Sequence, residues 1–207
     1  MKNSQVSQES IISTAVFGRG GLETVEARPK PKGTPRGASA IPADDLRRKL
    51  TAVQPDDNKL PHLSVAGDTY TVLVSGNDTS GRHCLIDMYI PPGGGPPPHR
   101  HNFEETFTML EGEIALVFRG EKLMARAGAT VNIPANAPHS FKNASSRPAR
   151  LLCMCSPAGL EQMFKRVGDP VNSRTAAPPG LSDTEKAERL QRAQVVASEF
   201  QTELLIP

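Results

Sequence analysis

The chain has little of what marks several protein classes. Its 207 residues contain no tryptophan, only 4% aromatic residues and a formal net charge of just +2. Because we find no basic stripe with interleaved aromatic side chains, we expect no nucleic-acid partner. No apolar run approaches the roughly 20 residues that cross a bilayer, so we expect no membrane span either.

Cysteine is also scarce, with Cys84, Cys153 and Cys155 as the complete set. An odd and sparse set does not indicate a disulfide framework. Cys153 and Cys155 stand two apart in an apolar run, where strand alternation places both on one face. We interpret all three as reduced, buried thiols, and a metal or redox role is the alternative.

A secretion signal is not evident. The nearest approach is IISTAVFG at residues 11–18, which is short, has only Lys2 as a preceding basic residue and is followed at once by Arg19. We therefore expect a cytoplasmic protein, with export through a degenerate N-terminal signal as the alternative.

Proline and glycine, in contrast, are frequent, at 19 and 17 residues. Many turns with few aromatics favour short strands over a helical bundle, so we expect an all-β domain. Residues 1–45 are polar and lack a period that could bury a face, which predicts a disordered arm. DDLRRKLTAV, residues 44–53, predicts a short helix before the domain.

The predicted β domain covers residues 46–157. Residues 69–75 and 83–90 have the β-branched and apolar character of strands, and residues 149–156 close the set. Between them, short apolar runs are cut at Gly112, Gly120 and Gly128, a spacing typical of sandwich or barrel strands.

Beyond Pro157 the period changes, which predicts a helical extension over residues 158–207. Residues 158–168 indicate a short helix, and a second helix begins at a capping box formed by Ser182 and Glu185. One side of the second helix is apolar: Ala187, Leu190, Ala193, Ala197, Phe200 and Leu204. We expect it to pack on the outside of the β domain, and a lid or partner-binding helix is the alternative.

PPHRHNFEE, residues 97–105, combines histidines with carboxylates. If this stretch is extended, His99, His101 and Glu105 point to one face. Arg100 and Glu104 then point to the other. Two imidazoles and a carboxylate on one face suit a borderline divalent metal and leave coordination positions open.

His139 is the candidate fourth ligand, because it follows turns expected at Gly128 and Pro134. Each histidine alone would be an ordinary polar residue, and we keep that interpretation for His62 and His83. The four residues together predict a metal site, because a polar loop explains them poorly.

These residues resemble the two motifs of the cupins. The first cupin motif is glycine, five residues, His-x-His, three or four residues, Glu, six residues and glycine, and its positions here are Gly93, His99, His101, Glu105 and Gly112. The second motif contains glycine, proline, glycine, histidine and asparagine, and its positions here are Gly128, Pro134, Asn136, His139 and Asn143. Asn136 replaces a glycine, and asparagine tolerates the left-handed conformation better than most residues.

The resemblance extends from about Leu60 to the C-terminus and is strongest to single-domain cupins called quercetin dioxygenase-like. It implies a cupin jelly-roll barrel, or double-stranded β-helix, with C-terminal helices. It also implies one divalent transition metal per chain, drawn from Fe, Mn, Ni, Co, Cu or Zn, and held by His99, His101, Glu105 and His139. A homodimer is a further expectation, since a partner commonly covers sheet edges.

Three functions are compatible with this resemblance, because the fold hosts many chemistries. The first is a dioxygenase that uses O2 on a flavonol-like or other aromatic enol, with Glu105 as the catalytic base. The second is a metal-dependent isomerase or lyase acting on a sugar or keto acid, and the third is a non-catalytic cupin that binds a small molecule. Four residues near the ligands are candidates for the pocket wall, and ordinary barrel core is their alternative role: Tyr89, Phe107, Met109 and Phe141.

Overall fold

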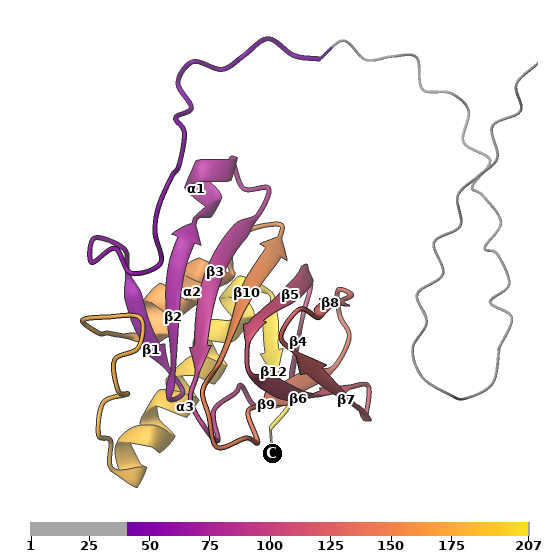
Figure 1. Ribbon diagram of the computed structural model, residues 1–207, viewed down its shortest axis with the longest axis vertical. Coiled ribbons are helices and arrows are strands. Elements are labelled where there is room, and N and C mark those ends of the chain that lie inside the picture. The colour runs from indigo at the N-terminus through magenta and orange to yellow at the C-terminus, as the bar shows by residue number, and fades with distance from the viewer. Residues whose placement is uncertain (1–40, 207) are drawn as a thin grey trace, which may run out of the picture. The chain divides into compact units, whose positions relative to one another are not determined.

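The structure is a computed structural model that describes residues 41–206 (Figure 1). The chain divides into two units, residues 1–44 and residues 45–207. Because only residues 41–44 of the first unit are described, the candidate export signal and nearly all of the predicted disordered arm lie outside the described residues. The following account concerns the second unit.

Strands make up most of this unit. In chain order they are β1 His62–Val65, β2 Asp68–Val74, β3 Cys84–Ile90, β4 His99–His101, β5 Glu104–Glu111, β6 Glu113–Phe118, β7 Glu121–Arg126, β8 Thr130–Ile133, β9 His139–Lys142, β10 Ala149–Ser156, β11 Asp169–Pro170 and β12 Thr202–Leu204. The helical elements are α1 Gly76–Thr79, α2 Leu160–Val167, α3 Asp183–Ala197 and the 3₁₀ turn η1 Ser198–Phe200.

The strands form two antiparallel sheets. One has the order β11-β1-β2-β3-β10-β5-β8 and the other the order β12-β4-β9-β6-β7. Their inward side chains form one core, which contains Ile86, Phe107, Leu116 and Leu151, each at most 1% exposed. This arrangement confirms the predicted all-β jelly-roll barrel with C-terminal helices.

Glycine and asparagine make several of the predicted turns possible. Gly112, Gly120 and Gly128 have φ values of 69°, 91° and 89°, and residues that carry a Cβ atom rarely adopt such values. Asn136 has φ of 67°, so it takes the left-handed conformation at the motif position where it replaces glycine.

The helix predicted over residues 44–53 is wrong. Residues 45–53 contain a turn at Leu46 and Arg47 but no helix. The Asp45 carboxylate instead accepts hydrogen bonds from the Arg47 side chain at 2.8 and 2.9 Å. Leu46 and Leu50 remain 87% and 92% exposed, and a short helix without a buried face is marginal in water.

The two C-terminal helices begin as predicted, but the second ends early. The Ser182 hydroxyl accepts from the Glu185 main-chain N–H at 3.3 Å, which confirms the capping box. Helix α3 then stops at Ala197, and Gln201, with φ of 53°, turns the chain back into β12. Phe200 and Leu204 therefore do not belong to the helix, because β12 pairs with β4 instead.

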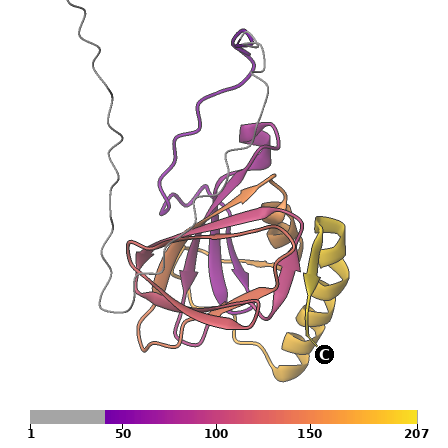
Figure 2. The same cartoon turned by 90° about the vertical axis from the view of Figure 1, so that its right-hand side faces the viewer.

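Helices α2 and α3 together contact both sheets. Helix α2 packs on β1 and β3 of the larger sheet, and α3 packs on α2 and on β12 of the smaller sheet. Figure 2 shows α3, in yellow, standing beside the barrel. Among the described residues, no helix has the length and apolar character that crossing a membrane requires.

Candidate metal centre

The four candidate ligands come from three strands in two sheets. His99 and His101 lie on β4, and His139 lies opposite His99 on the neighbouring strand β9. Glu105 lies on β5 of the facing sheet. The segment 97–105 is therefore not one strand, because the chain crosses between sheets at residues 102–103, yet the alternation expected of it is preserved.

Glu104 and Arg100 point away from these ligands. The Glu104 carboxylate accepts from the Asn132 side chain at 2.9 Å, and Arg100 donates to Glu203 at 2.5 Å. Both of these residues are solvent-exposed. The alternation thus separates the two neighbouring glutamates, and Glu105 alone faces the barrel interior.

The inward side chains converge on one point. Each of the four offers a ligand atom, and these atoms all lie within 4.8 Å of one another. The Glu105 Oε2 atom lies 3.2 Å from Nε2 of His101 and 3.1 Å from Nε2 of His139. His101, Glu105 and His139 are each at most 3% exposed, whereas His99 is partly buried, so the cluster is accessible mainly on the His99 side.

Main-chain carbonyls set the orientation of all three imidazoles. Each ring places Nδ1 against the carbonyl oxygen of a residue two positions away: His99 on Pro97 at 2.8 Å, His101 on Phe103 at 2.9 Å and His139 on Ala137 at 2.9 Å. A carbonyl oxygen only accepts, so Nδ1 carries the proton in each neutral ring. Each Nε2 therefore presents a lone pair to the centre.

This arrangement fits a cation. Three Nε2 lone pairs and a carboxylate oxygen repel one another unless a positive charge lies between them. Imidazole and carboxylate donors together suit Zn, Cu, Fe, Ni, Co or Mn in the divalent state. The cluster can thus hold one transition metal ion, and four protein ligands leave coordination positions for a substrate.

The ionisation states agree with a ligand role. Burial, with repulsion from His139, lowers the pKa of His99 to about 4, so this ring is neutral at pH 7. Burial alone raises the pKa of Glu105, but a proton or positive charge on the side of the His101 and His139 rings, where a metal cation would lie, outweighs burial and holds the pKa below its usual range. Glu105 is therefore a carboxylate at neutral pH.

A thiol lies behind the carboxylate. The Cys153 Sγ atom is 3.2 Å from Glu105 Oε1, and Cys155 Sγ is 4.0 Å from the same oxygen. Burial raises the pKa of Cys153 to about 12, so it remains a thiol and can donate its proton to Oε1. The three cysteines are free and buried, as predicted.

An apolar cavity of about 110 Å³ reaches His99 and Glu105. The barrel, helix α2, helix α3 and β12 all contribute to its wall. The apolar lining residues are Val65, Ala66, Met88, Pro96, Pro97, Phe107, Phe141, Leu160, Met163, Phe164, Val167, Leu190, Ala193 and Leu204. The site therefore opens onto a hydrophobic environment.

Two of the four residues predicted for the pocket wall line this cavity. Phe107 and Phe141 do so, and their rings meet edge to face at 5.4 Å. Tyr89 does not, because alternation along β3 puts it on the face opposite the buried Met88. Met109 is fully buried in the core but is not part of the cavity wall.

Several residues that line the cavity or contact Glu105 were not predicted from the sequence. Thr202 and Leu204 line the cavity from β12, and they alternate with the exposed Glu203. This alternation could have indicated a strand, but the apolar residues in it also fitted the period of the predicted second helix. Cys153 gave no comparable signal, because its position beside Glu105 depends on the pairing of β10 with β5.

His62 and His83 lie outside the cluster of candidate ligands. His62 is buried, and its Nδ1 lies 2.7 Å from the Thr71 hydroxyl oxygen. His83 is partly exposed at the start of the segment that leads into β3. Their placement agrees with the ordinary polar roles expected for them.

Comparison with known proteins yields related sequences and folds. The cupin-domain family matches residues 86–155. Quercetin 2,3-dioxygenase of Bacillus subtilis is 28% identical over 149 residues, which cover 67% of this chain and 44% of that enzyme. The HTH-type transcriptional regulator PuuR of Escherichia coli is 29% identical over 102 residues, covering 49% of this chain and 55% of the regulator. The chain thus spans about half the length of the curated relatives it matches.

Among solved structures, the polyketide cyclase RemF from Streptomyces resistomycificus aligns with a TM-score of 0.46 and 21% identity, over 72% of this chain and 98% of that one. The family match runs from within β3 to within β10, and both histidine motifs lie on the jelly-roll barrel described above. The chain belongs to the cupin superfamily.

Proposed function

We propose that the protein is a metal-dependent dioxygenase that acts on an aromatic enol such as a flavonol. The observation that carries this proposal is the position of three histidines and Glu105 at the end of an apolar cavity. The 28% identity to quercetin 2,3-dioxygenase supports the choice of reaction.

A divalent transition metal held by His99, His101, Glu105 and His139 would supply a Lewis-acid centre and, if redox-active, a route for electrons to O2. Three neutral imidazoles and one carboxylate leave such a site with one net positive charge. That charge favours an anionic oxygen donor, and an enol becomes one when it loses its proton.

Glu105 is the residue placed to accept that proton. It lines the cavity, and its Oε1 atom already accepts the Cys153 thiol. We therefore assign the proton to Oε2, the oxygen that faces the imidazoles. A carboxylate bound to a cation is a weak base, so Glu105 would accept the proton through Oε2 most readily if the bound metal shared or released that oxygen.

The cavity wall favours an aromatic substrate over a sugar or keto acid. No lysine, arginine, asparagine or glutamine is among the residues that line it. The Tyr70 hydroxyl donates to Asp68 at 3.0 Å, and the Thr202 hydroxyl donates to the Phe200 carbonyl at 3.2 Å. A sugar would leave its hydroxyl groups unpaired there, and a keto acid would lack a cationic side chain for its carboxylate.

Two other functions remain as alternatives. A metal-dependent isomerase or lyase would use the same ligands without consuming oxygen. A non-catalytic small-molecule-binding cupin is the second alternative, and the match to the regulator PuuR gives it support. We propose a cytoplasmic homodimer in each case.

Oxygen uptake tests the proposal. The protein, loaded in turn with Fe, Mn, Ni, Co and Cu, is given a flavonol in an oxygen electrode, and the zinc-loaded protein is the redox-inert control. Uptake with at least one redox-active metal is the expected result. Binding of the flavonol without uptake would favour the non-catalytic cupin. A sugar or keto acid that is converted without uptake would favour the isomerase or lyase.

A further inference from the structure

The cavity that reaches Glu105 is small for the substrate class proposed above. Its volume is about 110 Å³, whereas sites for drug-sized ligands span roughly 300–1,000 Å³. A flavonol has a fused two-ring head that carries the enol, and a third ring attached to that head. The inner cavity has room for the enol ring only, so the rest of such a molecule needs further space.

A second cavity lies next to the first. It has a volume of about 400 Å³ and lies between the β1–β2 turn, the segment before α3 and α3 itself. Its wall includes Pro178, Pro179 and Leu181 from the segment before the helix. We call it the outer cavity. Five residues line both cavities: Val65, Ala66, Val167, Leu190 and Ala193.

The shared wall lies where α2 and α3 bridge the two sheets. Val65 ends β1 and Ala66 begins the β1–β2 turn. Val167 ends α2, and Leu190 and Ala193 lie one turn apart on α3. A molecule that passes between the turn and the helix would therefore go from the outer cavity to Glu105 without crossing a strand.

We propose that the outer cavity is the distal half of the substrate site, and that it holds an uncharged ring or chain attached to the reacting enol. This inference rests on the proposed function and extends it to substrate size. The enol ring occupies the inner cavity at His99 and Glu105, and the remainder of the substrate lies beneath α3.

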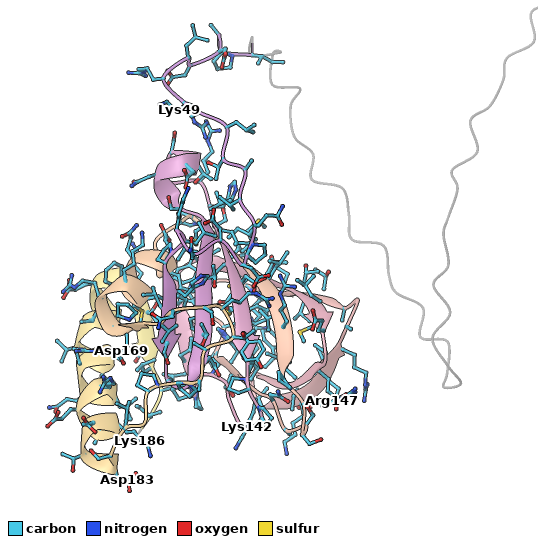
Figure 3. The ribbon with its side chains drawn as sticks, turned by 60° about the vertical axis from the view of Figure 1, so that its left-hand side comes forward. Lys49, Lys142, Arg147, Asp169, Asp183 and Lys186 are labelled. Carbon is cyan, nitrogen blue, oxygen red and sulfur yellow. The ribbon has the colours of Figure 1, made fainter. Side chains whose placement is uncertain are left out.

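The charges around the outer cavity support an uncharged occupant. Arg189 lines it, but its guanidinium donates to Asp169 at 2.8 and 2.9 Å. Lys186 also lines it, and its ammonium lies 2.9 Å from Asp183. Figure 3 shows Asp183 and Lys186 on α3, and Asp169 beside this helix. Both cations have an acidic partner, and the other walls of the outer cavity are mainly apolar, so the cavity suits an uncharged occupant better than a carboxylate or phosphate.

Ala193 lies where the inner and outer cavities adjoin. It is partly buried and belongs to both walls, and its methyl side chain leaves the passage open. A phenylalanine at this position would fill the space between α3 and the β1–β2 turn. Ala187 lies on the same helix, is exposed and lines neither cavity, so the same substitution there is a matched control.

Two probes with the same chelating head separate the inner cavity from the outer one. They are 3-hydroxy-4-pyranone, which is a single ring, and 3-hydroxyflavone, which adds a fused ring and a phenyl ring. Their dissociation constants are measured by calorimetry with zinc-loaded protein, so that no turnover is required. The proteins are the unaltered chain, Ala193→Phe and Ala187→Phe.

We expect Ala193→Phe to weaken the binding of 3-hydroxyflavone by at least about tenfold, because its two additional rings lose their apolar contacts in the outer cavity. Because Ala193 also borders the inner cavity, the affinity for 3-hydroxy-4-pyranone should fall too, but by at least about threefold less than that for 3-hydroxyflavone, and Ala187→Phe should change neither constant. Equal weakening of both probes by Ala193→Phe, or no weakening of the larger one, would overturn the proposed distal half.

The proposed function fails in a different way. If the unaltered protein binds both probes as expected but consumes no oxygen with either when loaded with a redox-active metal, the two-part site stands and the dioxygenase proposal is wrong. If the unaltered protein binds the single-ring probe but not the flavone, the two-part site is wrong while the metal-bound enol survives. Failure to bind either probe overturns both.

Discussion

Cys153 and Glu105 face each other inside the barrel, with the thiol sulfur 3.2 Å from carboxylate Oε1. The other oxygen, Oε2, faces the imidazoles of His101 and His139. The carboxylate is thus held between a donor on β10 and the candidate metal ligands. Its orientation depends on a residue that no cupin motif includes.

Replacing that thiol should weaken the site. Cys153→Ala leaves the buried Oε1 atom with only the longer 4.0 Å contact from Cys155, so we expect the free energy of unfolding to fall by about 1–3 kcal/mol. Metal affinity should fall by roughly 10- to 100-fold, as is typical when a partner of a metal ligand is lost. Cys153→Ser keeps a donor and should retain most of the affinity. Denaturation of the metal-free protein and competition with a chelator measure the two effects.

Cys84→Ala is the matched control, because Cys84 is equally buried but is not one of the residues clustered at Glu105. It should lower stability and leave metal affinity unchanged. If Cys153→Ala and Cys84→Ala had the same metal affinity, the role of the Cys153 thiol would be refuted.

The histidines of the cluster should determine the metal content. His101→Ala and His139→Ala each remove an Nε2 ligand atom. We therefore expect the metal content of each variant to fall well below one ion per chain. His62→Ala removes a buried ring that contacts Thr71 and should retain the metal. Elemental analysis of the purified proteins makes the comparison, and equal metal in all three variants would rule out the assigned ligands.

Glu105 should be needed for turnover more than for folding. Glu105→Gln keeps the side-chain volume and the three histidines, so the fold and much of the metal should remain. Loss of the base should reduce oxygen uptake with a flavonol by roughly 10²- to 10⁴-fold. Glu104→Gln, on the outer face of β5, should be nearly silent. Unchanged uptake by Glu105→Gln would show that another group takes the proton.

Asp68 should make stability depend on pH. Burial raises its pKa to about 7, against the opposing hydrogen bonds from Tyr70 and Gly95. The unfolded carboxyl titrates near pH 4, so between about pH 4 and pH 7 the native state binds more protons than the unfolded state. Stability should therefore fall as the pH rises through this window and level off above it.

The Asp68→Asn variant tests this dependence, because its side chain does not titrate. Relative to the variant, the unaltered protein should lose roughly a few kcal/mol of unfolding free energy between pH 4 and pH 8. Urea denaturation at several pH values gives both curves. Parallel curves would mean that Asp68 ionises normally in the folded protein.

The homodimer prediction also has a structural test. Strand β7 ends the smaller sheet, and its Leu123 and Met124 are 51% and 40% exposed. We expect light scattering to give about 44 kDa, twice the chain mass of 22.2 kDa. Leu123→Lys should shift the mass toward the monomer if this edge is the interface. A monomer mass for the unaltered protein would contradict the dimer.

Local patterns in the sequence were sufficient for much of the fold. Strand alternation separated Glu105 from Glu104, because successive side chains in a strand point to opposite faces whatever the strand packs against. Turns at Gly112 and Asn136 could be anticipated from residues that tolerate positive φ. The start of α3 at Ser182 followed from a capping interaction within four residues.

The tertiary structure decided what joins distant parts of the chain. The crossing at residues 102–103 places Glu105 on a different sheet from His99, and only then do their ligand atoms meet. Strand β12 lies beside β4 because main-chain groups pair across about 100 residues of sequence, which a local helical period cannot anticipate. Conversely, residues 45–53 have helix-forming side chains but no helix, because no element within residues 41–206 covers Leu46 or Leu50. Periodicity thus determined which side of a strand each residue takes, while long-range pairing and packing decided which of those sides face one another.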